Sequence, residues 1–357
     1  VWIPRYKYKV WNYNADGNQG SDEQPIEIAW EEGIEKTGQI SCTDSISVTE
    51  ESSPSETCKL IATNEVCTDD TCNGKFYNHP AFTFGDEEIP GFWIGKFELT
   101  GTISNITTKP NLSSLRSQTV SAFETNIMKM KNSGNQYGFS TTTDTHMIKN
   151  LEWGAVAYLS HSEYGACLGG SCGDVAINSN SSYITGNGPD TSSDANEYNG
   201  DVGMYASTTQ NTYGVYDMSG GAEEYVMGNL VGNDGKTMMS GTNSSYNSGY
   251  TGIIYDSGNY TSYTGIDYPN AKYYDKYSWG KPNELIRSKL GDGIKEVNNW
   301  PYDLSMAIIS EPWFIRGLNY RGGDSQYNSG LFGTTNDSAG EADSNISTRL
   351  IFIPQSK

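Results

Sequence analysis

The first eleven residues, VWIPRYKYKVW, alternate between apolar and polar side chains. Tyr6 and Tyr8 fall on one face of this segment, and Arg5 and Lys7 fall on the other. An alternation with a period of two predicts a half-buried antiparallel strand. Apolar runs at 26–30 and 91–99 predict two further strands.

Two amphipathic helices are predicted by apolar residues that recur every three or four positions. In 117–132 the apolar face consists of Val120, Phe123, Ile127 and Met130, and Gly134 follows as a helix C-cap. In 145–160 it consists of Ile148, Leu151, Ala155 and Leu159, with Asp144 or Thr145 as the N-cap.

From 165 to 345 the chain is rich in Gly, Asn, Ser, Thr and Tyr, with short apolar islands at 214–218, 224–227, 253–255, 313–315 and 350–353. Such islands predict short strands joined by long polar loops. The closing run LIFIP is similar to the opening run VWIP, so we expect the two terminal strands to pair with each other. Strands, two helices and then many strands indicate an α+β fold.

The chain has 357 residues and a net charge of −20, and these numbers exclude some classes of function. A surface this acidic repels nucleic acids and anionic lipids. No apolar run reaches the roughly 18 residues that a membrane-spanning helix needs. Residues 15–90 hold 17 acidic and three basic side chains, a net of −14. We therefore expect one domain over 1–357 that carries an acidic surface insertion at 15–80.

Six cysteines in short local spacings favour disulfides in an oxidising compartment. Neighbours in sequence close the smallest loops, which favours Cys42–Cys58, Cys67–Cys72 and Cys167–Cys172, although six cysteines allow 15 connectivities. A zinc site that uses Cys67, Cys72 and His79 is the alternative. The other two histidines, His146 and His161, flank the second predicted helix, where we expect them to cap it or to lie exposed.

Six ordered segments together resemble the formylglycine-generating-enzyme (sulfatase-modifying factor) branch of the C-type lectin fold. They are VWIP at the start, FWIGKFELT at 92–100, MIKNLEWGAVAY at 147–158, GVYDMSGGAEEY at 214–225, Arg-Gly-Gly at 321–323, and Arg349 before the last strand. The resemblance implies a C-type-lectin-like fold with two helices, short antiparallel strands, long loops and paired terminal strands. More narrowly, the chain is similar to pilin-like surface proteins of Gram-positive gut bacteria and to variable proteins of diversity-generating retroelements.

The resemblance also implies a structural calcium ion. Side-chain oxygens of Asp217 and Glu224 and backbone carbonyls of Gly220 and Ala222 are the ligands that it implies. Carboxylates and carbonyls suit calcium. Where the family has an Asn-x-Trp-Glu motif, this chain has Gly-Ala-Glu-Glu at 221–224, so Glu223 replaces a buried Trp.

The same comparison argues against catalysis, because the family's copper-binding Cys pair is missing from 321–357. We therefore expect a non-catalytic, extracellular adhesion domain, such as the head of a pilin-like filament subunit. The alternatives are a phage receptor-binding protein on a virion surface, a filament subunit whose loops contact only its own copies, and a metalloenzyme of the same fold.

Residues 321–349 form the candidate ligand-binding loop, which is rich in adaptable polar residues with a few larger anchors. The partner would be a protein or a glycan on another cell or surface. The candidate contact residues are Asp324, Ser325, Gln326, Tyr327, Asn328, Leu331, Phe332, Thr334, Asn336, Asp337, Asp343 and Asn345.

Overall fold

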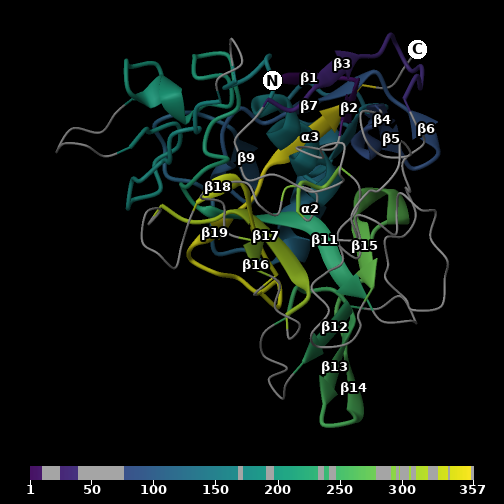
Figure 1. Cartoon of the computed structure of the whole chain (residues 1–357). Coiled ribbons are helices and arrows are strands. Elements are labelled where there is room, and N and C mark those ends of the chain that lie inside the picture. The colour runs from purple at the N-terminus through teal and green to yellow at the C-terminus, as the bar shows by residue number, and fades with distance from the viewer. Residues whose placement is uncertain are drawn as a thin grey trace.

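The protein is described by a computed structural model that covers most of the chain. The described residues are 1–9, 25–38, 76–167, 172–189, 197–231, 237–240, 247–278, 291–294, 297, 305–306, 311–320, 329–336 and 338–354. Within them the protein combines several β-sheets with two α-helices (Figure 1), which confirms the predicted α+β class.

A four-stranded antiparallel sheet joins the two ends of the described chain. Its order is β1 (Trp2–Pro4), β7 (Gly91–Ile94), β20 (Leu350–Ile353) and β10 (Asp144–Met147). The terminal strands β1 and β20 therefore do not pair with each other as we predicted, because β7 lies between them and pairs with both. The inward-facing side chains of this sheet are Ile3, Phe92, Ile94, Ile351 and Ile353, all buried in the main core.

The largest sheet is built around β11 (Glu223–Val231), in the order β14-β13-β12-β11-β17-β18-β16, with β15 and β19 also pairing with β11. The hairpin of β13 and β14 projects away from the end of the molecule that holds β1 and β7 (Figure 1). The predicted island 214–218 lies outside the named strands, and the other four islands lie within them. The remaining strands of this sheet are β12 (Thr237–Ser240), β13 (Gly252–Asp256), β14 (Asn259–Tyr263), β15 (Asp275–Ser278), β16 (Ser305–Met306), β17 (Trp313–Gly317), β18 (Gly330–Thr335) and β19 (Ile346–Ser347).

The predicted first strand is interrupted at Arg5, where the chain passes from β1 into β2 (Tyr6–Lys9) of a second sheet. Arg5 was expected on the polar face, but it is buried and forms ion pairs with Glu31 and Glu88. The smaller sheets consist of β3 (Ile28–Trp30), β2 and β4 (Phe76–Asn78), of β5 (Thr83–Phe84) with β6 (Glu87–Glu88), and of β8 (Thr100–Thr102) with β9 (Asn105–Thr107).

The two predicted helices exist but are shorter than their apolar patterns. Helix α2 (Val120–Met128) has Thr119 as its N-cap, and α3 (Asn150–Ser160) begins after Lys149. The segment before α3 was predicted as helix and is instead β10, because it pairs with β20 at the edge of the four-stranded sheet. Short 3₁₀ segments are η1 (Pro80–Phe82), η2 (Lys129–Lys131), η4 (Gly203–Ala206) and η5 (Ala271–Tyr273).

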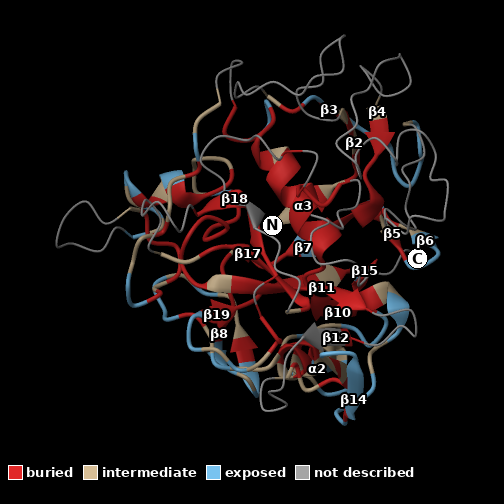
Figure 2. Cartoon of the chain, turned by 60° about the horizontal axis from the view of Figure 1, so that its bottom comes forward, coloured by how far each residue is buried: buried red, intermediate tan, exposed pale blue. Residues whose placement is uncertain are grey.

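The core has two main parts. The first surrounds α3, and the second lies between α2 and the face of β11 and β17. Figure 2 shows α3 and most of β11 as buried. Ile26 and Ile28, which belong to the predicted 15–80 insertion, pack in the first part, so the described portion of that segment is not merely a surface appendage. The rest of the insertion, with its four cysteines, lies outside the described residues.

Candidate functional site

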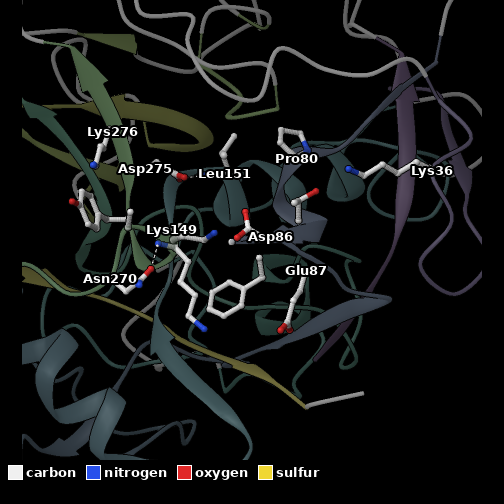
Figure 3. Close-up of a pocket in the computed structure, with 15 residues that line it drawn as sticks. Lys36, Pro80, Asp86, Glu87, Lys149, Leu151, Asn270, Asp275 and Lys276 are labelled. Carbon is white, nitrogen blue, oxygen red and sulfur yellow. Dashed lines mark hydrogen bonds between the residues drawn. The ribbon is translucent and has the colours of Figure 1, made fainter. Parts of the chain in front are cut away.

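An open pocket of about 770 Å³ lies at the N-terminal end of α3 (Figure 3). Its size falls in the range of about 300–1,000 Å³ that ligand pockets usually have. Three walls form it: the β5–β6 hairpin, the start of α3, and the segment from η5 into β15. Its lining residues are Lys36, Pro80, Thr83, Phe84, Gly85, Asp86, Glu87, Lys149, Leu151, Asn270, Ala271, Lys272, Tyr274, Asp275 and Lys276.

The charge of this pocket differs from that of the chain. Four lysines and three carboxylates line it, whereas acidic residues outnumber basic ones by 43 to 23 in the whole chain. Figure 3 shows Lys36 and Lys276 on opposite sides, with Lys149 and Asp86 between them. A local excess of cations in an acidic protein favours a ligand that carries negative charge.

Aromatic rings hold two of the lysine side chains over the pocket floor. The Nζ atoms of Lys149 and Lys272 lie 5.3 Å and 4.6 Å from the ring centroid of Phe84. Such cation–π contacts stabilise ammonium groups without neutralising them. The charge of Lys272 therefore stays available to a ligand, whereas Lys36 is paired with Glu88, and the buried Lys149 lies 3.8 Å from Glu152 Oε1.

A buried imidazole supports this floor from below. The ring of His146 stacks on Phe84 with centroids 5.0 Å apart, and its nitrogens lie 2.8 Å from Asp144 Oδ1 and 3.0 Å from Glu152 Oε1. Burial opposes its charged form, but Glu152 and Asp144 raise the pKa of His146 to about 9. The prediction that His146 caps a helix or lies exposed is therefore wrong, since the ring is fully buried and paired with two carboxylates.

Two carboxylates fix the start of α3. Glu152 accepts a hydrogen bond from the backbone N–H of Lys149 (2.8 Å), and Asp275 accepts one from the N–H of Leu151 (2.8 Å). Carboxylates at these positions satisfy the free N–H groups of the first helical turn. The pocket wall is therefore held by charged hydrogen bonds rather than by loop residues alone.

The residues that the resemblance assigned to calcium lie elsewhere, between β11 and the loop before it. Asp217 is buried with a φ of +63°, and its carboxylate accepts hydrogen bonds from Gly186 N–H and Asn178 Nδ2 (both 2.8 Å). Glu224 on β11 accepts two hydrogen bonds from Arg349, at 2.9 and 2.6 Å. Gly220 and Ala222 lie between these two acids, and Ala222 N–H donates to the nearby Glu98 (2.9 Å).

The buried carboxylates of this cluster are those of Glu98, Asp217 and Glu224. All three interact with the charge of one guanidinium, that of Arg349. Burial, reinforced by the charges of Asp217 and Glu224, holds the pKa of Glu98 well above its ordinary value. Burial likewise raises the pKa of Asp217 to about 6 and that of Glu224 to about 7, although Arg349 opposes both shifts. Sequence reasoning missed Glu98 as a member of this cluster, although it lies within the quoted segment 92–100.

Asp217 and Glu224 fit a calcium site only in part. Carboxylate oxygens are suitable donors, and Glu224 Oε2 is buried with no hydrogen-bond partner. Both oxygens of Asp217, however, already accept hydrogen bonds, and Arg349 occupies Glu224 Oε1. Among the described residues, no three or more His, Cys, Asp or Glu side chains are arranged as metal ligands. A calcium ion here would have to displace these donors.

The predicted ligand loop is only partly described. Leu331, Phe332, Thr334 and Asn336 are buried, Leu331 and Phe332 within the main core. These two side chains were expected as contact anchors and instead pack around α3. His161 stacks on Phe332 and is the C-cap residue of α3, which confirms the capping alternative, although it is buried. Asp343 is half-buried and Asn345 is exposed, both just before β19, and Asn345 accepts a hydrogen bond from Tyr183. The candidates outside the described residues are Asp324, Ser325, Gln326, Tyr327, Asn328 and Asp337.

Of the predicted disulfides, Cys167–Cys172 is present, and the other four cysteines lie outside the described residues. No helix of the described chain is long and apolar enough to cross a membrane. The sequence matches no protein-family model, and no curated protein is significantly similar to it.

Proposed function

We propose that the chain is a non-catalytic binding domain of an extracellular surface protein, such as the head of a pilin-like filament subunit of C-type-lectin-like fold. The pocket beside α3 carries this proposal, because it gathers cations on a rigid floor in an otherwise acidic protein. The Cys167–Cys172 disulfide supports an oxidising compartment. The missing Cys pair in 321–357 supports binding rather than oxidation chemistry.

The ligand group that suits this pocket is an acidic sugar. Lys272 and Lys276 offer ammonium groups to a carboxylate, while exposed Asn270 and Asp86 offer hydrogen-bonding partners to hydroxyl groups. A ligand with one carboxylate and several hydroxyls uses both sets. A polyanion would be repelled by the net charge of −20.

Calorimetric titration with glucuronate and N-acetylneuraminate, with glucose as the neutral control, tests the proposal. We expect both acidic sugars to bind and added salt to weaken their binding. Lys272→Gln should lower the affinity at least fivefold, whereas Lys129→Gln, on η2 and outside the pocket lining, should not change it. If neither acid binds more tightly than about 1 mM, or if glucose binds equally well, the pocket assignment is wrong. Antibody labelling of intact cells or virions tests the surface location separately.

A further inference from the structure

A row of five aromatic side chains crosses the outer face of the four-stranded sheet. It consists of Trp2, Trp93, Phe352, Phe139 and Tyr137, and we call it the aromatic row. Successive ring centroids are 5.5, 6.4, 4.9 and 6.1 Å apart. The first three residues are paired in register across β1, β7 and β20, so the row runs perpendicular to the strands.

The alternation of each strand places these rings outside. Ile3, Phe92 and Ile351 face the core, and their neighbours Trp2, Trp93 and Phe352 therefore face away from it. Trp93, at the centre of the sheet, is 42% exposed, which is a large exposed fraction for a tryptophan on an inner strand. The other four rings of the row are half-buried, so Trp93 is its most exposed part. Apolar surface that is exposed in this way is a candidate interaction site.

The rings are held in fixed positions. A Cβ atom at Gly91 would lie 2.6 Å from Trp2 Cζ2, so the absence of a side chain there leaves room for the Trp2 indole. At the other end, Asn135 donates a hydrogen bond to Phe139 O (2.8 Å) and accepts bonds from the N–H groups of Tyr137 and Phe139. Pre-positioned aromatic rings lose little conformational freedom on binding.

The segment that carries the last two rings of the row is uncharged. Residues 132–143, which carry Tyr137 and Phe139, contain no Asp, Glu, Lys or Arg in a chain whose net charge is −20. This segment carries exposed amides and hydroxyls instead, which belong to Asn132, Ser133, Gln136, Ser140, Thr141 and Thr142. At this end of the row, a neutral ligand rich in hydroxyl groups would find hydrogen-bonding partners.

From this geometry we infer that the aromatic row is a second binding surface, which holds a neutral polysaccharide. The polarised C–H groups of a pyranose face are attracted to the negative faces of aromatic rings, and its hydroxyls pair with the bordering amides and hydroxyls. Successive ring centroids lie between 4.9 and 6.4 Å apart, a spacing comparable to the length of one sugar unit in an extended chain. The surface is separate from the lysine pocket, with which it shares no residue.

Retention on insoluble neutral polysaccharides tests this inference with the full chain. We expect wild-type protein to sediment with amorphous cellulose or colloidal chitin, and cellohexaose or chitohexaose to quench its tryptophan fluorescence. Trp93→Ala should reduce the retained fraction at least tenfold, and Phe139→Ala, outside the sheet, should reduce it if Trp93→Ala does not fold. Tyr260→Ala, at a more exposed aromatic on the distant β14, should have no effect.

Lys272→Gln should leave retention unchanged, which separates this surface from the acidic-sugar pocket. The inference is overturned if neither polysaccharide retains the wild-type protein, or if Trp93→Ala and Phe139→Ala are both retained as well as the wild type. It is also overturned if wild type is a dimer in solution and Trp93→Ala a monomer, because the row would then be an interface between copies.

Discussion

Phe84 and His146 stack with an interplanar angle of 16°, so the open pocket rests on a buried positive charge. The ammonium groups of Lys149 and Lys272 lie 5.3 Å and 4.6 Å from the centroid of the same Phe84 ring. Asp144 and Glu152 pair with His146, and Glu152 also lies 3.8 Å from the ammonium group of Lys149.

The first prediction concerns the protonation of His146. Its pKa in the folded protein, about 9, exceeds its ordinary value of 6.5. Its stabilising contribution is therefore complete below pH 6.5 and is lost as the pH rises through 9. The stability difference between wild type and His146→Gln should shrink by about 2 kcal/mol between pH 7.5 and 9.5, measured by urea denaturation.

His161→Gln is the matched control for this experiment. Burial lowers the pKa of His161 to about 3, so this residue is neutral in both the folded and the unfolded protein above pH 7.5. The loss of unfolding free energy caused by His161→Gln should therefore not change between pH 7.5 and 9.5. A constant cost for His146→Gln would show that His146 is not protonated in the folded state.

The second prediction concerns Glu98, whose pKa is raised by burial and by two neighbouring acids. An acid with a raised pKa gives stability that is present below its unfolded pKa and lost as the pH rises towards its folded pKa. In chelator, Glu98→Gln should match the wild type near pH 4.5 and exceed it at pH 8 by at least about 1 kcal/mol. Thermal unfolding measures this difference, and Glu87→Gln, at an exposed site, should show no such trend.

The third prediction concerns Arg349, which is fully buried against Glu224. Its removal leaves carboxylates buried without a counter-charge, so Arg349→Gln should destabilise the protein by about 3–5 kcal/mol. The double variant with Glu224→Gln should recover part of that loss in urea denaturation. If the double variant loses the sum of the two single effects, the two residues are not coupled. Arg116→Gln serves as the control at a less buried arginine.

The fourth prediction is calcium binding at Asp217 and Glu224. Because both acids titrate between about pH 6 and 7, calcium should bind more tightly at pH 8 than at pH 5. Calorimetry on chelator-treated protein measures the calcium affinity at each pH. Asp217→Asn should lower this affinity. Absence of binding below millimolar calcium at pH 8 would refute the calcium assignment.

Part of this architecture could be predicted from local sequence. The periods of three to four around Phe123 and Ala155 marked both helices, although α3 is buried on nearly all sides and not on one face alone. The segment Asp144–Met147 was misassigned because its strand pairing depends on β20, two hundred residues later. Leu331 and Phe332 were taken for loop anchors, since nothing local shows that β18 packs against α3.

The pocket had no sequence signal of its own. Lys36, Lys149, Lys272 and Lys276 come from three distant segments and converge only in the folded chain. Glu98 was quoted within a strand motif, yet its link to Asp217 and Glu224 depends on the approach of β11. Residues that share a motif were therefore predictable, whereas residues that share only a place in space were not.

The position of β20 between β7 and β10 also bears on how the protein is made. On the ribosome, β7 and β10 emerge long before the strand that joins them, so each waits with an unpaired edge. Pairing across such a distance in sequence is slow. We expect newly made chains to depend on chaperones until residue 353 is free, and nonsense variants that end before Leu350 to aggregate rather than to leave a smaller functional domain.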